Sequence, residues 1–150
     1  MSWLKFLHIL GATVWLGGGA TLIVLGLRTR RSSDPSAVAE FGRVVQYVGM
    51  RLLGPAWIVL LITGVWMVLV SAAWNFSQLW VLIALGLFTL AFLIGVAYLS
   101  RVGIQLARLG SGGQATDGAA LVGRWILGYG LVVAALLVAV WDMVFKPGLG

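Results

Sequence analysis

Four long apolar runs dominate the sequence and constrain its fold more than any other feature. They cover about residues 3–27, 52–73, 79–99 and 125–145. A helix needs about 20 residues to cross a hydrocarbon core about 30 Å thick, and each run is long enough to do so. None alternates between apolar and polar residues over a sustained stretch, as the strands of a transmembrane β-barrel do. The sequence therefore predicts an all-α bundle of four transmembrane helices in a single domain, residues 1–150.

The composition indicates that lipid surrounds these runs. Hydrophobic residues make up 61% of the chain and charged residues only 9%, whereas soluble domains are about half apolar and about a quarter charged. No stretch interleaves basic and aromatic residues in an exposed arm, so we expect membrane lipids as partners, and not nucleic acid. Cysteine is absent, which excludes disulfides, thiolate metal sites and thioether-attached haem.

The basic residues predict the orientation of the four helices. Eight of the ten fall in the first and third connections, namely Arg28, Arg30, Arg31, Arg43, Arg51, Arg101, Arg108 and Arg124. The other two, Lys5 and Lys146, fall at the opposite side. Because an excess of positive charge marks the cytoplasmic side, we expect both termini to lie outside the cytoplasm. Five tryptophans near the outer helix ends predict an aromatic belt: Trp3, Trp66, Trp74, Trp80 and Trp141.

The connections between the runs differ in length and character. In the first, Asp34 and Pro35 predict the start of a short amphipathic helix at the membrane interface, about residues 35–50, which could merge into the second transmembrane helix. The second connection, SAAWNFSQ, predicts a tight hairpin. The third begins as a continuation of the third transmembrane helix and then becomes the glycine-rich stretch GSGGQATDG, which predicts a flexible segment.

His8 is the only histidine and lies about two turns into the first apolar run. Helical spacing places Gly11 and Trp15 on or near its face, and small residues let a helix or a flat ligand approach the backbone. An ionisable residue inside a membrane suggests a function, and imidazole is the usual axial ligand of haem iron. The structural alternative is a hydrogen bond from His8 to a neighbouring helix, and the sequence leaves both interpretations open.

Other residues could complete a haem b site in which His8 is the iron ligand. One histidine cannot supply two imidazole ligands in a monomer, so Met67, Met143, an open position, another residue type or a second copy of the chain would occupy the opposite side. A methionine in an apolar helix is, however, more often a filler. Arg51 could bind a haem propionate, although contact with a lipid phosphate is the simpler interpretation.

Asp142 lies near the outer end of the fourth run, at a depth similar to that of His8. A carboxylate in this position needs a partner. His8 or Lys5 could serve, but Lys146 follows four residues later, on the same helical face, and is the expected partner. We therefore predict a structural ion pair between Asp142 and Lys146.

Several motifs in order along the chain resemble a known bacterial membrane family. The first helix reads KFLHILGATVWLGGG, the second begins MRLLGPAWIVLLITGVWMVL, and the last begins at RWILGYG and ends in VFKPG. This set resembles the integral membrane family called domain of unknown function 2269. It is similar, more distantly, to the HemJ-type protoporphyrinogen oxidases and to the CopD-like membrane proteins. The resemblance covers nearly the whole chain and implies a multi-pass protein of the bacterial inner membrane.

The more distant resemblance implies haem binding. The first-helix histidine of HemJ-type proteins corresponds to His8, and their second-helix arginine and proline correspond to Arg51 and Pro55. Their third helix also carries a lysine, whereas the matching stretch LWVLIALGLF has none. For that reason the oxidase activity is not carried over, and whether the protein is an enzyme stays open. CopD-like proteins use more metal ligands than this chain offers, so copper transport is not carried over either.

We therefore expect a small polytopic membrane protein that binds haem b as a redox protein or as part of a redox complex. The alternative is a non-catalytic accessory subunit, because glycine-rich helix faces and short loops suit packing against a larger membrane complex or a second copy of the chain. A transporter is a third alternative, although four helices with a single histidine offer little to bind a polar solute.

Overall fold

A computed structural model of the protein describes residues 2–32, 34–109 and 118–148, in which helices are the only regular elements. The helices are α1 (Ser2–Arg31), α2 (Pro35–Val48), α3 (Gly54–Leu69), α4 (Leu79–Leu93), α5 (Ser100–Leu109) and α6 (Gly118–Phe145). Short π-helical segments, Gly49–Leu53 and Ile94–Leu99, join α2 to α3 and α4 to α5. The described chain therefore forms four continuous rods, each long and apolar enough to cross a membrane. This confirms the predicted four-helix integral membrane fold.

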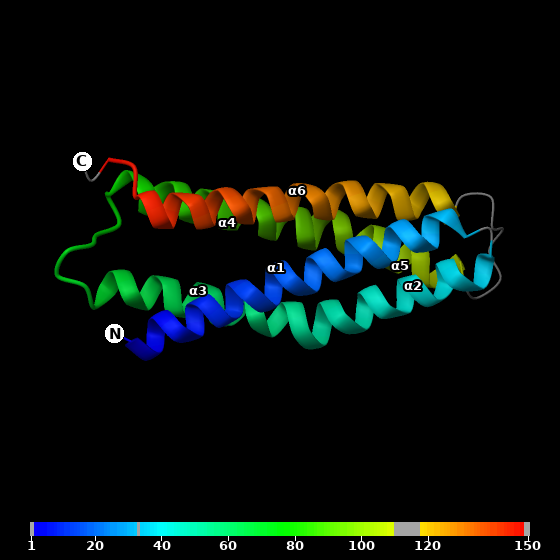
Figure 1. Ribbon diagram of the computed structural model, residues 1–150, viewed down its shortest axis with the longest axis horizontal. Coiled ribbons are helices and arrows are strands. Elements are labelled where there is room, and N and C mark those ends of the chain that lie inside the picture. Colours follow the sequence, from blue (N-terminus) through cyan, green and yellow to red (C-terminus); the bar gives the residue numbers. More distant parts are fainter. Residues whose placement is uncertain (1, 33, 110–117, 149–150) are drawn as a thin grey trace.

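The short helix predicted at about residues 35–50 merges into the second transmembrane helix, which was one of the two expected arrangements. Helix α2 begins near the predicted position and continues through the π-helical segment into α3, so that one rod of 35 residues runs from Pro35 to Leu69. Figure 1 shows α2 in line with α3, so α2 is not a separate helix. The third rod likewise continues past the predicted span to Leu109, as expected. The glycine-rich stretch GSGGQATDG falls, except for its last residue, outside the described residues.

Asp34 fixes the start of α2. Its carboxylate accepts hydrogen bonds from the hydroxyl and the backbone N–H of Ser36, both at 2.8 Å. These bonds, the side-chain one foremost, hold the pKa of Asp34 below its usual value. Pro35 follows at the first helical position, where its missing N–H costs nothing.

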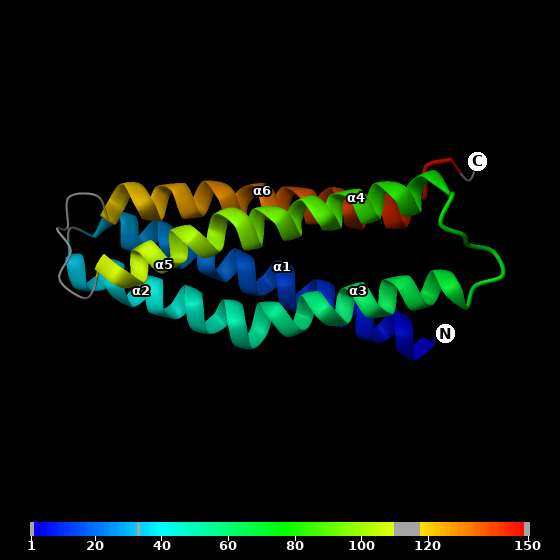
Figure 2. The same ribbon diagram turned by 180° about the vertical axis from the view of Figure 1, so that it is seen from behind.

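The four rods form an elongated bundle (Figures 1 and 2). Helix α1 packs against α3 and α6, α4 packs against α6, and α2 packs against α5. The N- and C-terminal ends lie at the same end of the bundle as the α3–α4 connection, and we call this the terminal end (Figure 1). The opposite end, where α1 leads to α2 and where α5 ends, is called the arginine end.

Most of the tightly packed core lies toward the arginine end. The ring of Phe41 meets the edge of Trp125 at 5.4 Å between centroids, and Trp125 stacks on Tyr129 at 5.0 Å. Gly42 lets α2 and α5 approach closely, because a Cβ there would lie only 2.7 Å from the backbone nitrogen of Ala107. Helices α2 and α5 thus bury their apolar faces against each other, which explains why α2 stays in the bundle.

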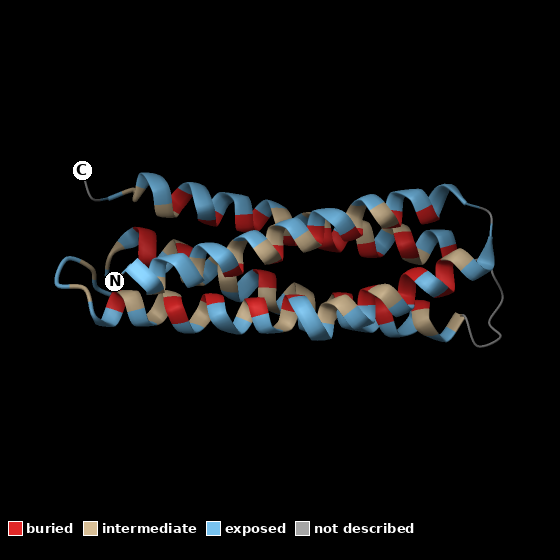
Figure 3. Ribbon diagram, turned by 60° about the horizontal axis from the view of Figure 1, so that its bottom comes forward, coloured by how far each residue is buried: buried red, intermediate tan, exposed pale blue. Residues whose placement is uncertain are grey.

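The outer surface of the bundle is apolar. Figure 3 shows exposed residues over much of the helical surface, with the buried ones between the rods. Many of the exposed side chains are large hydrophobic ones on all four rods, including Val24, Ile62, Leu93 and Leu131. Such a surface is unfavourable in water and is the normal one in lipid. The protein is therefore an integral, multi-pass membrane protein.

Candidate functional site

A cavity of about 540 Å³ lies at the terminal end, between α1, α3, α4 and α6. It forms because α3 packs on α1 and α4 packs on α6, while the connection over residues 70–78 spans the space between α3 and α4. Small lining residues, Ala12, Gly64, Ala84 and Ala139, leave room within it. The volume falls within the ~300–1,000 Å³ that is typical of sites for small molecules and cofactors.

Stacked aromatic side chains form the floor of the cavity. Phe88 of α4 lines it and stacks on Trp57 of α3 at 5.6 Å between ring centroids. Trp15 of α1 meets the edge of Phe88 at 5.8 Å. These rings pack α1, α3 and α4 against one another below the cavity. The cavity itself is lined mainly by aliphatic and aromatic side chains.

His8 lies in the wall of the cavity, partly buried between α1 and α3. Its ring nitrogen Nδ1 is 3.0 Å from the hydroxyl oxygen of Thr63. This hydroxyl donates its proton to the backbone oxygen of Val59, one turn earlier in α3, at 2.6 Å. A hydroxyl has a single proton, so with that proton used for the oxygen of Val59 we assign Nδ1 of His8 as the donor in the bond to Thr63.

The state of the second ring nitrogen follows from this bond. Because Nδ1 carries the proton in neutral imidazole, Nε2 carries a lone pair. Metal-bound histidines are commonly fixed in the same way, by a hydrogen bond from the nitrogen that does not bind the metal. The structural and the ligand-binding interpretations of His8 are therefore compatible, because each uses a different nitrogen.

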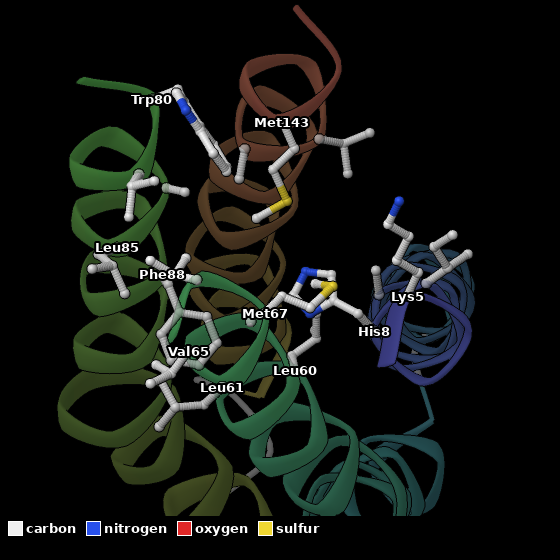
Figure 4. Close-up of a pocket in the computed structure, with 18 of the residues that line it drawn as sticks. Lys5, His8, Leu60, Leu61, Val65, Met67, Trp80, Leu85, Phe88 and Met143 are labelled. Atoms are coloured by element: carbon white, nitrogen blue, oxygen red, sulfur yellow. The ribbon is translucent and has the colours of Figure 1, made fainter. Parts of the chain in front are cut away.

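Met67 and Met143 line the same cavity, from α3 and α6. In Figure 4 their sulfur-bearing side chains and the imidazole of His8 point into a common space. The structure thus brings together three of the residues singled out in the sequence. No cluster of three or more His, Asp or Glu side chains suited to a metal ion occurs in the described ranges. A bare metal ion would have few ligands here, whereas haem iron needs only one or two from the protein.

The remaining predicted site residues lie elsewhere. Gly11 lies against α3, where a Cβ would come within 3.2 Å of the backbone oxygen of Ala56, so it makes room for a helix and not for a ligand. Trp15 is buried beneath the cavity and supports Phe88. Arg51 is exposed in the π-helical segment that precedes α3 and does not line the cavity. The structure gives no support to Arg51 as a propionate ligand at this cavity.

Two lysines lie at the rim. Lys5 comes from α1, and Lys146 follows the end of α6; both line the cavity. The amine of Lys146 lies over the ring of Trp74, 4.6 Å from its centroid, and 5.6 Å from that of Trp80. These cation–π contacts hold the charge of Lys146 against the α3–α4 connection.

These contacts correct two predictions. Asp142 does not pair with Lys146: it is fully buried, and neither carboxylate oxygen has a hydrogen-bond partner among the described residues. Trp3, Trp66 and Trp141 are exposed, as expected of an aromatic belt, but Trp80 is buried and Trp74 is half-buried against it. Both of these line the cavity instead.

Thr63, Gly64 and the two lysines were not predicted as site residues. A Cβ on Gly64 would lie 3.1 Å from Cε1 of His8, so this glycine leaves space for the imidazole. Thr63 and Gly64 are adjacent in an otherwise apolar run, and that break in the pattern was a usable signal. The lysines carried a signal as well, as the two positive residues at the outer side.

Comparison with known proteins identifies the family. A family model described as "Predicted integral membrane protein (DUF2269)" matches residues 2–147. No curated protein and no solved structure matches the chain. The more distant similarity to HemJ-type and CopD-like proteins therefore stays a prediction. Because the match covers almost the whole sequence, the chain belongs to the DUF2269 family of predicted integral membrane proteins.

Proposed function

We propose that the protein binds haem b in the cavity at the terminal end, that His8 would hold its iron, and that the protein acts as a one-electron redox protein of the membrane. The observation that carries this proposal is the pair of hydrogen bonds at the Thr63 hydroxyl, one with His8 and one with Val59. Thr63 donates to the backbone oxygen of Val59 and accepts from Nδ1 of His8, so Nε2 is left with a lone pair in a residue that lines a cavity of cofactor size.

The residues that line the cavity suit haem b. A haem b supplies iron that exchanges one electron when it is held by the protein. The cavity offers one imidazole, two thioethers and an apolar lining. Histidine alone, or histidine with methionine, is an established ligand set for haem iron. Arg51 has no part in the proposal.

Each residue of the site has a separate task. Thr63 orients the imidazole of His8 through the bond at 3.0 Å, as an outer-shell residue does for a metal ligand. Phe88 and the aromatic rings behind it close the floor and keep water out. Met67 or Met143 would raise the reduction potential if its sulfur occupied the second axial position.

The test is the absorption spectrum of the protein purified from haem-replete cells. We expect a Soret band that is lost in the variant His8→Ala. It should be kept in Met67→Leu and in Met143→Leu. If one of these methionines also holds the iron, its leucine variant should show a shifted spectrum in the reduced state. The matched control is Thr13→Ala, which changes another lining residue of α1 without touching His8. A colourless wild-type protein that also fails to take up added haemin would contradict the proposal.

A role as accessory subunit predicts a different result. A chain that served only as a packing subunit would be recovered with a stable protein partner in mild detergent and would show no Soret band. We expect the opposite pattern, in which colour depends on His8 whether or not a partner protein is present.

A further inference from the structure

The charge at the terminal end is concentrated at the cavity. Lys5 and Lys146 are the two positively charged side chains of this end among the described residues, and both line the cavity. Asp142 is the acidic residue of this end, and it is fully buried away from the lining. Within the described chain, therefore, no exposed carboxylate neutralises the two amines at this end.

The polarity of the cavity changes sharply with depth. Below the rim the lining consists almost entirely of aliphatic and aromatic side chains, with Phe88 at the floor and Leu60 and Leu85 in the walls. Figure 4 shows Lys5 on α1 at one side of the cavity, with the apolar side chains of Leu61 and Phe88 lower in the view. A ligand that matches this arrangement has an apolar body and one negatively charged end.

Lys146 is held in position for such a ligand. Its backbone leaves the helix with φ of 46°, and its amine lies over Trp74 and Trp80 at the mouth. The indole rings fix the ammonium group without neutralising it, since their attraction comes from the ring faces and not from a carboxylate. Lys5 lines the same cavity, so an anionic group of a ligand at this end has two amines with which it can pair.

We infer that the cavity takes up an amphiphilic carboxylate, whose apolar body fills the space between α1, α3, α4 and α6 and whose carboxylate lies between Lys5 and Lys146. The inference rests on the proposed function only because both concern the same cavity. It adds that the ligand carries a negative charge and states which way the ligand points. The propionates of haem and the headgroup of a fatty acid share this chemistry. A ligand of either kind enters with its charged end toward the terminal side of the membrane.

The experiment uses a photoreactive fatty acid that carries a diazirine near the end of its chain. The full-length protein in nanodiscs of neutral lipid is irradiated with this probe or with its methyl ester, and labelled peptides are located by mass spectrometry. We expect the acid to label residues deep in the cavity, such as Phe88 and Leu85, and the ester to label them far less. Labelling of lipid-facing Leu131 reports the amount of probe in the membrane and should be the same for both.

Variants assign the effect to the lysines. We expect Lys5→Gln or Lys146→Gln to lower cavity labelling by the acid about fivefold each, and the double variant on the order of twentyfold, since each removes one ion pair at a partly exposed site. Arginine at either position should restore labelling. Arg108→Gln, which removes an exposed positive charge at the arginine end, is the matched control and should change nothing. Equal cavity labelling by acid and ester, or full labelling of the double variant, would overturn the inference.

Haemin and haemin dimethyl ester separate this inference from the proposed function. Preference for haemin, lost in the double lysine variant, supports both. A Soret band that depends on His8 but is the same with the dimethyl ester supports haem binding and overturns the inference. Absence of any Soret band, together with labelling that needs the free carboxylate and the lysines, overturns haem binding and identifies a fatty-acid-like ligand.

Discussion

The Nδ1 atom of His8 and the hydroxyl oxygen of Thr63 lie 3.0 Å apart and join α1 to α3 beside the cavity. The variant Thr63→Val keeps the shape of this side chain and removes the acceptor. We expect it to leave a partly buried N–H unpaired at a cost of about 1 kcal/mol, to lower thermal stability, and to weaken haem binding because the ring is no longer held. Thermal unfolding and haem titration measure the two effects.

Thr63→Ser is the matched variant for this prediction. It keeps the hydroxyl that accepts from His8 and should behave like the wild-type protein in both measurements. If Thr63→Val bound haem with wild-type affinity and an unchanged spectrum, the hydrogen bond would have no part in orienting His8.

The orientation of the bundle can be tested because the chain has no cysteine of its own. Single cysteines are placed at Ala72, in the α3–α4 connection, and at Ser32, between α1 and α2; both positions are exposed. The arginines at the Ser32 end predict that this end is cytoplasmic. A maleimide that cannot cross membranes should label Ala72→Cys in intact cells and Ser32→Cys only after the cells are opened. The reverse pattern would show that the bundle is inverted.

Alanine substitutions at Gly42 and at Gly17 can be compared to test helix packing. A Cβ on Gly42 would lie 2.7 Å from the backbone of α5, whereas a Cβ on Gly17 meets no atom within 4 Å. We expect Gly42→Ala to destabilise the protein by about 1–3 kcal/mol, since backbone atoms cannot move aside cheaply. Gly17→Ala should be neutral or stabilising by up to about 1 kcal/mol, as alanine favours the helix. Equal stability of the two variants in thermal unfolding would mean that α2 and α5 can separate freely.

The length and apolarity of the runs were enough to predict the four spans. In lipid, a single apolar segment of about 20 residues satisfies its own backbone hydrogen bonds only as a helix. The path of α2 was less well determined. An amphipathic stretch of this length can lie on a membrane surface or stand against another helix, and its own sequence does not distinguish the two. The deciding feature is the matching apolar face of α5, which is separated from α2 by more than fifty residues.

The site was partly predictable for a similar reason. His8 stood out because it is the one histidine in an apolar helix, and the structure places it in the wall of the cavity. The pairing of Asp142 with Lys146 was wrong because it assumed helical geometry through Lys146. Helix α6 ends at Phe145, and the backbone of Lys146 adopts φ of 46°, which turns its side chain toward Trp74. Neither the end of a helix nor a tertiary partner follows from spacing alone.

Asp142 has no exposed surface, and its carboxylate lacks a hydrogen-bond partner in the described part of the chain. A buried polar group without a partner lowers stability, and an apolar group of similar shape relieves that cost. We therefore expect Asp142→Leu to unfold at the same temperature as the wild-type protein or at a higher one. Ala135→Leu, on the same buried face of α6, should instead lose about 1–3 kcal/mol through overpacking, which shows that the assay detects packing at this face. A clear loss of stability in Asp142→Leu would show that the carboxylate has a binding partner in the folded protein, such as a bound cation.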